Sequence, residues 1–344
     1  LYVSLGMAKY ERPNVMHGLE NRQILKNMLC VRYQSDKKGI TVNEDALPVG
    51  YTYDKIMHKE DYDSLTPLER QAALLEYAVL DEDGEKILEQ QEKTFENGKS
   101  PSDDTITHGD LKITESDRAS YKGSRLKGKK HGKINLKFRT EKKSETYLVL
   151  KGLSSRSKVR KKQILSVKSK KARFEIPMCA VSNEKEMNRD FIAVNLGVAQ
   201  MGTCSLCFHK SHTYKLNDME IRGISESFIK EQTKERREES MTEVKQSTNR
   251  ISGKISVSED KILQLAVPYS EGWHIYIDGK EAKTFTSSVA YTGVLIEKGE
   301  HTVEMHYISP WIIPGTVLSV AAWIWMALSF AVKKRRISAD KRIK

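Results

Sequence analysis

The chain has 344 residues and a formal net charge of +12, with 38% hydrophobic and 30% charged residues. This length predicts two or three folded units, and aromatic and β-branched residues that recur along the whole chain exclude wholesale disorder. Four cysteines exclude a disulfide-based scaffold, and eight prolines with twenty glycines exclude collagen-like and low-complexity classes.

The first hundred residues combine helical and extended patterns and predict a mixed α/β segment over residues 1–100. Within it, residues 46–54 are typical of an extended, aromatic-bearing loop or edge strand. The sequence Thr-Pro-Leu-Glu at residues 66–69 predicts a helix start, because Thr can cap, Pro suits the first helical position and Glu can complete a capping box. Apolar residues at helical spacing extend this helix to about Leu80, and we expect the acidic residues 81–83 at its solvated end.

Residues 85–130 are polar and show no apolar period, so we expect a linker that leads into a new domain. From Ile134 onward, short strand patterns recur at a spacing typical of a β-sandwich or jelly roll, which we place at residues 101–224. The expected strands of this region cover residues 134–138, 146–150, 163–167, 172–176, 191–194, 203–208 and 212–221.

The excess of positive over negative charge is concentrated in one stretch of this β region, residues 118–173, called the basic segment below. It contains 21 Lys or Arg residues and two acids, whereas the chain outside it and outside the last twelve residues has a net charge of −13. Three interpretations stay open: a solvated sheet face, attraction to an anionic surface or polymer, and nucleic-acid binding. Because no aromatic platform or nucleic-acid motif accompanies the charge, we expect no nucleic-acid partner.

Residues 225–249 are rich in Glu, Lys, Arg and Gln and predict an exposed linking helix. Strand patterns return over residues 250–309, where Asp278-Gly279 is a good hairpin signal. The last expected strand, 301–307, runs almost directly into an apolar segment. This second β domain is therefore expected to be membrane-proximal.

A membrane span is predicted over Trp311–Val332, a segment without any charged residue. As a helix it reaches about 33 Å, enough for a hydrocarbon core of about 30 Å. Four cations follow at residues 333–336, so the positive-inside rule places the basic tail 333–344 in the cytoplasm and residues 1–309 outside it. A buried core helix is the alternative, although core helices rarely run this long without a charge.

The predicted fold class is mainly β with some α. It comprises an extracytoplasmic α/β segment, two β-sandwich or jelly-roll-like regions, and one C-terminal transmembrane helix over residues 310–332. The lipid bilayer is the partner that this organisation requires.

Several short sequences before the span carry a family likeness: PYSEGWHIYIDGK (268–280), YTGVLI (291–296), KGEH (298–301), LPVGYTYD (47–54) and LTPLERQAALL (65–75). In this order and spacing they resemble the YfhO-like bacterial membrane proteins over most of residues 20–332. The first of these sequences is only moderately specific by itself, because other envelope proteins use it. The ordered combination with the final span is much stronger.

The resemblance implies a polytopic plasma-membrane protein of Gram-positive-type bacteria. Such proteins are similar to glycosyltransferases that take sugar from a polyprenyl-phosphate donor outside the cytoplasm and decorate cell-envelope polymers such as lipoteichoic acid. The chain begins at Leu1, with neither Met nor a signal peptide, and it lacks the N-terminal transmembrane bundle of the family pattern. The resemblance places the catalytic acid in an early loop between spans, so no residue here inherits that role and an enzymatic activity of this chain stays open.

The aromatic candidates for ligand contact come from two places in the sequence. Tyr51, Tyr53 and Asp54 are candidates for contact with a glycan or a lipid-linked donor, and the alternative is packing against neighbouring parts of the protein. Trp273, beside the Asp-Gly hairpin, is a candidate sugar-stacking platform, and the alternative is a buried aromatic that pins the hairpin.

The basic segment supplies the candidates for binding an anionic wall-polymer acceptor: Lys127, Lys129, Lys130, Lys161 and Lys162. A second group has the residue types of a metal cluster: Cys204, Cys207, His209 and His212. In a strand, however, positions three apart face opposite sides and lie about 10 Å from each other. We therefore interpret the second group as ordinary strand residues and predict no metal and no cofactor.

Two functions stay open beside a portion of a glycosyltransferase. One is a non-enzymatic, membrane-tethered module that binds wall polymer or a partner protein. The other is the extracytoplasmic domain of a transporter, for which paired repeats among upstream spans would be the discriminating feature.

Overall fold

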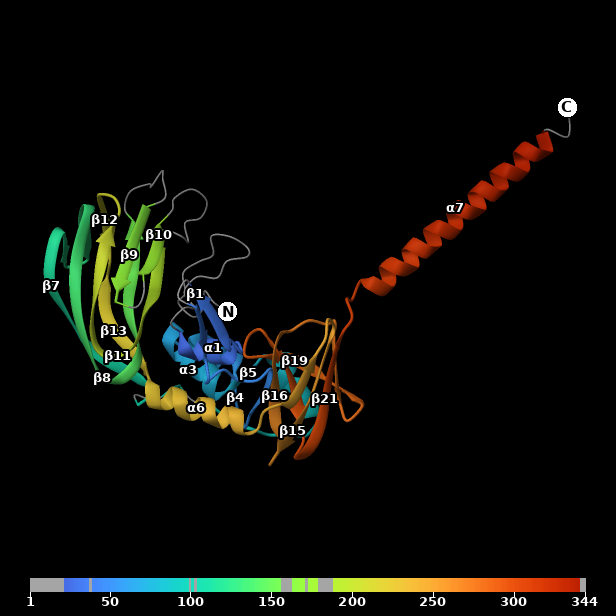
Figure 1. The fold of residues 1–344 in the computed structure, drawn as a ribbon, viewed down its shortest axis with the longest axis horizontal. Helices are drawn as coiled ribbons and strands as arrows, with labels where there is room; N and C mark the ends of the chain where they lie inside the picture. Colours follow the sequence, from blue (N-terminus) through green and yellow to red (C-terminus); the bar gives the residue numbers. More distant parts are fainter. Residues whose placement is uncertain are drawn as a thin grey trace.

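The computed structural model describes residues 22–36, 39–98, 100–101, 104–155, 163–170, 173–178 and 188–340. Most of these residues belong to β-sheets, and one long apolar helix ends the described chain, so the predicted fold class is confirmed. Figure 1 shows a tall sheet unit at the left, a smaller α/β unit at the centre, and the last helix projecting away from both.

The N-terminal segment contributes short helices and strands: α1 (Gln23–Met28), β1 (Tyr33–Asp36), β2 (Gly39–Val42), β3 (Gly50–Tyr53), β4 (Lys55–His58), α2 (Lys59–Ser64), α3 (Pro67–Glu76), β5 (Ala78–Leu80), α4 (Glu82–Gln90) and β6 (Glu96–Asn97). The predicted start of α3 is confirmed, since Thr66 N donates to Glu69 Oε2 at 2.7 Å. The predicted end near Leu80 is wrong, because the residues of β5 leave the helix to pair with β4. Asp81 does not end a helix but starts α4, where its Oδ1 accepts from Gly84 N at 3.0 Å.

The next part of the chain is a seven-stranded sheet built from β7 (Ile106–Lys122), β8 (Arg125–Ser155), β9 (Gln163–Ser169), β10 (Arg173–Met178), β11 (Asn188–Phe208), β12 (His212–Lys215) and β13 (Asp218–Ser225). Four of the short strands predicted here are halves of two long ones, because β8 has 31 residues and β11 has 21. The linker predicted over 85–130 is also wrong. The first residues of this stretch belong to α4, and its last 25 residues lie mostly in the β7–β8 hairpin. In this hairpin, cross-strand hydrogen bonds stabilise strands whose polar sequences show no apolar period.

This sheet folds over on itself. Along the first half of β8, even-numbered side chains are mostly buried and odd-numbered ones exposed. The pairing of β8 with β11 is then irregular around Gly197 and Met201. Beyond this bend, Leu148 and Leu150 of the second half share one apolar core with Ile134 and Leu136 of the first. One long-stranded sheet thus supplies both layers of the sandwich-like unit.

Helices cover the other face of the second half of β8. Tyr147 and Val149 point to this side and lie in a common core with residues of α1, α3 and α6 (Glu226–Glu238). Helix α6 confirms the helix predicted within 225–249, although that region ends in a strand, β14 (Thr242–Gln246). Figure 1 shows α6 running from the folded sheet toward the C-terminal strands.

The C-terminal part is a second sandwich, formed by β14 and by β15 (Arg250–Val257), β16 (Lys261–Pro268), β17 (Trp273–Ile277), β18 (Lys280–Ala282), β19 (Thr284–Ser287), β20 (Tyr291–Ile296) and β21 (Gly299–Tyr307). One sheet has the order β14-β15-β21-β17-β18 and the other β3-β16-β20-β19-β5-β4-β6, with a shared apolar core between them. The hairpin predicted at Asp278-Gly279 is confirmed, with φ angles of +50° and +78° at the turn.

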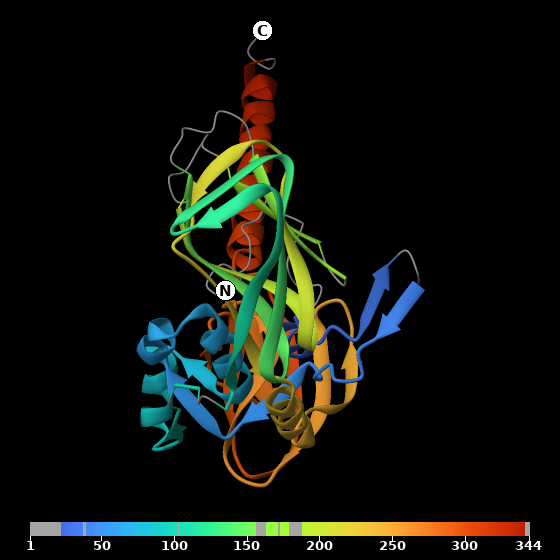
Figure 2. The same cartoon turned by 90° about the vertical axis from the view of Figure 1, so that its left-hand side faces the viewer.

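N-terminal strands complete the second of these sheets. Thr52 of β3 lies opposite Leu263 of β16, and Leu80 of β5 lies opposite Ser287 of β19. Figure 2 shows these N-terminal and C-terminal strands side by side below the folded sheet. Residues that the sequence assigns to separate units, 1–100 and 250–309, are therefore hydrogen-bonded together, and the division of the chain into domains stays a prediction.

Helix α7 (Ile312–Asp340) contains the predicted span except its first residue, Trp311. Pro314–Ala331 is, within the described residues, the one window long and apolar enough to cross a membrane, and none of it is buried. A core helix would be covered by other elements, so the alternative of a buried core helix is wrong. The helix continues beyond the apolar window to Asp340.

Candidate functional site

The sequence-predicted site residues lie on three different elements. Tyr51, Tyr53 and Asp54 belong to β3 and the residue after it, Trp273 begins β17, and Lys127, Lys129 and Lys130 lie near the start of β8. Lys161 and Lys162 lie outside the described residues.

Tyr51 and Tyr53 are packed into the interior, each with 0% of its surface exposed. The Tyr51 hydroxyl accepts from Gln264 Nε2 at 2.8 Å, and the Tyr53 hydroxyl donates to Leu74 O at 2.7 Å. Burial raises the pKa of Tyr53 to about 12. These contacts join β3 to β16 and α3, so the packing alternative fits the environment of both rings.

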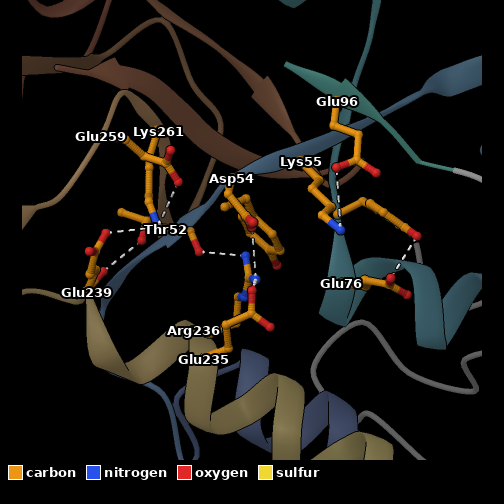
Figure 3. A network of polar contacts seen from close by, with 12 residues as sticks. Thr52, Asp54, Lys55, Glu76, Glu96, Glu235, Arg236, Glu239, Glu259 and Lys261 are labelled. Carbon is orange, nitrogen blue, oxygen red and sulfur yellow. Dashed lines mark hydrogen bonds and ion pairs between the residues drawn. The ribbon is translucent and has the colours of Figure 1, made fainter. Parts of the chain in front are cut away.

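Asp54 lies at the edge of a polar network around Arg236, a residue of α6 that is 2% exposed (Figure 3). Arg236 Nη1 donates to Thr52 O at 2.9 Å, and Nη2 donates to Asp54 Oδ1 at 3.2 Å. The guanidinium carbon also lies 4.8 Å from the centroid of the Tyr53 ring. Burial by itself raises the pKa of Asp54, but the Arg236 charge and hydrogen bonds outweigh it and lower the pKa. This network fastens α6 to β3.

A second buried network surrounds Glu145, which is 0% exposed. Its Oε2 accepts from Gln23 N at 2.7 Å, and its Oε1 accepts from Asn195 Nδ2 at 2.9 Å and from the Tyr147 hydroxyl. The fully buried Arg22 donates through Nη2 to Ala193 O at 2.8 Å, with its guanidinium 5.1 Å from the Tyr147 ring. Burial raises the pKa of Glu145 above its usual value, although hydrogen bonds and Arg22 oppose the shift. The network joins α1 to the folded sheet.

The raised pKa of Glu145 predicts a dependence of stability on pH. Its folded-state pKa lies above the unfolded value near 4.5, so its favourable contribution is complete below that pH and is lost as the pH rises through the folded-state pKa. We therefore expect the free energy of unfolding of the wild type, relative to that of Glu145→Gln, to fall as the pH rises above the unfolded value. Urea unfolding of both proteins from about pH 4 to about pH 8 measures this difference, and a constant difference would contradict the assignment.

The metal-like residues of β11 and the start of β12 occupy ordinary strand and strand-end positions. Cys204 and Cys207 are buried strand residues, opposite Leu136 and Lys133, which confirms the strand interpretation. Their neighbours are engaged with hydroxyls, since His209 Nε2 lies 3.0 Å from Ser166 Oγ and His212 Nε2 lies 2.7 Å from Ser155 Oγ. Among the described residues, no three His, Cys, Asp or Glu side chains lie together in a way that could hold a metal ion.

One exposed cluster of cations stands out at the end of the folded sheet, and we call it the basic tip. Its members are all exposed: Lys122, Arg125, Lys127, Lys129, Lys130, Lys210 and Lys215. Arg125 lies directly opposite Lys122 on β7 and is also paired in register with Lys215 on β12. The loop after β11 joins the same end, because Lys130 N donates to Ser211 Oγ at 3.0 Å. Like charges placed opposite each other repel, so this row is unfavourable without an anion.

The basic tip differs from the opposite end of the same sheet in the pairing of its charges. Near α6, Lys142 pairs with Asp104 and Lys143 pairs with Glu226. At the basic tip, no carboxylate from the described part of the chain forms an ion pair with any member. The uneven pairing concentrates free positive charge on a region much smaller than the basic segment.

Comparisons with known proteins connect the chain to one family. The family model described as "Bacterial membrane protein YfhO" matches residues 2–319. A curated relative, the "Uncharacterized protein YfhO" of Bacillus subtilis (strain 168), is 22% identical over 142 residues. That match includes 41% of this chain and 16% of the relative, so the chain spans a small part of the relative's length.

Three solved structures show remote likenesses to the chain. The family GH115 4-O-methyl-α-glucuronidase BtGH115A aligns with a TM-score of 0.28 at 12% identity, over 46% of this chain and 24% of that one. A cycloisomaltooligosaccharide glucanotransferase of Paenibacillus sp. aligns at 0.22 and 8% identity, over 58% and 44%. The arabinofuranosyltransferase AftD from Mycobacteria aligns at 0.19 and 8% identity, over 59% and 24%.

Proposed function

The chain belongs to the bacterial membrane protein family YfhO, and from this premise we propose that it forms the extracytoplasmic portion of an envelope glycosyltransferase. In this proposal the basic tip receives an anionic polymer acceptor of the lipoteichoic acid type. The sugar comes from a polyprenyl-phosphate donor, and catalysis belongs to membrane spans upstream of Leu1. The basic tail of α7 faces the cytoplasm, and the folded sheet lies on the other side of the membrane.

The observation that carries the acceptor role is the row formed by Lys122, Arg125 and Lys215. Side chains opposite each other on neighbouring strands lie about 5 Å apart, close enough for one phosphate group to contact two cations. Because these cations have no internal carboxylate partner among the described residues, a bound polymer displaces no ion pair. Binding of a polyanion would also remove the repulsion within the row.

One observation favours a second candidate function, a membrane-tethered module that binds polymer without transferring sugar. Tyr51, Tyr53 and Asp54, the residues proposed for donor contact, are occupied by contacts with α3, α6 and β16. In this candidate the basic tip has the same ligand but no chemistry follows.

The acceptor role predicts a specific effect of charge reversal. We expect the triple variant Lys122→Glu, Arg125→Glu and Lys215→Glu to bind a teichoic-acid-like polymer about tenfold or more weakly than the wild type at low salt. The difference should shrink as salt is added, because the exposed charges are screened. Affinity is measured with the full chain in liposomes by titration with labelled polymer.

A matched control separates the basic tip from net charge. Lys245, Lys280 and Lys298 are exposed cations of the C-terminal sandwich, and reversing all three gives the same change in net charge. We expect this control to bind nearly as the wild type does. Equal losses in the two triple variants, or no loss in either, would overturn the assignment of the acceptor to the basic tip. Sugar transfer by the complete membrane protein then distinguishes the first candidate from the second.

A further inference from the structure

The apolar face of the five-stranded sheet continues beyond the core of the sandwich. On β21, Val303 and Met305 are fully buried and Tyr307, on the same face, is 36% exposed. On the neighbouring strand, Ile275 is fully buried and Trp273 is only half-buried. Alternate residues of a strand share a face, so the core side of the sheet ends in a partly exposed aromatic pair.

This pair is built as a firm unit. Trp273 lies opposite Tyr307 in the ladder, with the rings edge to face and their centroids 5.0 Å apart. The loop before Trp273 is tied to the outgoing chain, because Ile308 N donates to Gly272 O at 2.8 Å. A side chain at Gly272 would bring its Cβ to 2.6 Å from Ile308 O, so only glycine permits this close approach. The loop and the chain that leaves the sheet are therefore held together.

More exposed apolar side chains surround the pair. Tyr269 is 39% exposed, Ile308 46% and Trp311 80%. Together with Trp273 and Tyr307 we call them the aromatic end. Residues 268–273 and 307–311 contain one acid, Glu271, and no Lys or Arg. The aromatic end therefore lacks the cations that recognise anionic lipid headgroups.

The aromatic end is also continuous with the membrane span. Trp311 is the fourth residue after Tyr307, and this length of chain reaches about 14 Å at most. The apolar window of α7 begins three residues later, at Pro314. The headgroup layer occupies about 5–8 Å on each side of the hydrocarbon core, and Trp and Tyr concentrate there. Chain connectivity therefore keeps the aromatic end within reach of this layer.

We propose that the aromatic end inserts into the interfacial layer of the bilayer and docks the C-terminal sandwich against the membrane. The partner is the carbonyl and headgroup zone of the lipid, entered by aromatic rings and not through anionic headgroups. Docking fixes the orientation of the sandwich relative to α7. Because β3 and α6 connect this sandwich to the folded sheet, docking also limits the heights at which the basic tip can lie above the membrane.

The positions of the tryptophans permit a direct test. The chain has four, and three of them, Trp311, Trp323 and Trp325, lie just before or within α7. Changing these three to Phe leaves Trp273 as the single fluorophore and alters only exposed side chains. In phosphatidylcholine vesicles with a bromine or nitroxide quencher on the lipid, we expect shallow labels to quench Trp273 at least about twice as strongly as labels near the bilayer centre.

The control places the fluorophore away from the proposed interface. Met201, 61% exposed on β11 of the folded sheet, is changed to Trp in a chain whose four tryptophans are Phe. We expect this Trp to be unquenched by either label. Quenching of Trp273 no greater than that of the control would overturn the proposal. If Trp273 is quenched only when the vesicles also contain the anionic lipid phosphatidylglycerol, the proposal that aromatic rings recognise the lipid is overturned.

A second variant tests whether the exposed rings cause docking. In the single-Trp273 chain, Tyr269→Ser removes one exposed ring outside the Trp273–Tyr307 pair. We expect weaker quenching by shallow labels with an unchanged circular dichroism spectrum. Unchanged quenching in this variant would show that tethering by α7 alone holds Trp273 near the lipid and would overturn docking by the rings. Neither result depends on polymer binding, so failure here is distinguishable from failure at the basic tip.

Discussion

Replacing Glu145 by Ala is expected to lower the free energy of unfolding by about 3–5 kcal/mol. The substitution removes the acceptor for Gln23 N, Asn195 Nδ2 and the Tyr147 hydroxyl, all in the interior. It also removes the carboxyl group that interacts electrostatically with the fully buried Arg22. Buried donors that lose their acceptor are among the most destabilising defects in a folded protein.

The control for Glu145 is Glu141, the other acid of the basic segment. Its side chain is exposed, and the hydrogen bond that Gln200 Nε2 donates to it goes to its backbone carbonyl. We expect Glu141→Ala to unfold at the same urea concentration as the wild type. Glu145→Gln keeps an acceptor oxygen and should lie between the two. A Glu145→Ala protein as stable as Glu141→Ala would show that the buried network does not hold α1 to the sheet.

The second large effect is expected for Arg236→Met, which should lower the free energy of unfolding by about 3 kcal/mol. Met preserves much of the packing volume but cannot bond to Thr52 O or pair with Asp54. This loss of stability is at the lower end of the range for buried ion pairs, because the Asp54 side chain is 27% exposed and can be hydrated in the variant. The contact between the guanidinium and the Tyr53 ring is lost as well.

Lys234 provides the matched control on the same helix. Its side chain is 81% exposed and its one carboxylate neighbour, among the described residues, is Glu238 at 3.7 Å. We expect Lys234→Met to leave the urea midpoint unchanged, since exposed pairs of this kind add little stability. If Arg236→Met and Lys234→Met have the same urea midpoint, the contact between α6 and β3 is not what joins the folded sheet to the C-terminal sandwich. A double-mutant cycle with Asp54→Asn isolates the pairwise energy.

The elements that sequence reasoning placed well are those with local signals. The capping residues of α3, the Asp-Gly turn after β17 and the uncharged stretch of α7 each depend on a few neighbouring residues. The polar β7–β8 hairpin has no such signal. Its outward side chains meet water and their cross-strand partners, so no apolar period marks it in the sequence.

The candidate site was only partly foreseeable. Lys127, Lys129 and Lys130 were identified from charge density along the chain, but Lys122, Lys210 and Lys215 joined them only through strand pairing and the loop contact. Conversely, Lys142, Lys143 and Lys151 count toward the basic segment but meet carboxylates from other elements. Arg236 was missed because it lies in a charged stretch typical of an exposed helix.

The sequence by itself determined the membrane span, the predominance of strands and the family, because hydropathy, alternation and ordered motifs are properties of consecutive residues. The tertiary structure alone decided which strands meet and which charges are buried. Thr52 lies opposite Leu263 across about two hundred residues of chain, and Asp54 finds Arg236 across a similar distance. A charge is stabilised in the interior or left free at the surface according to partners that only the folded chain brings together.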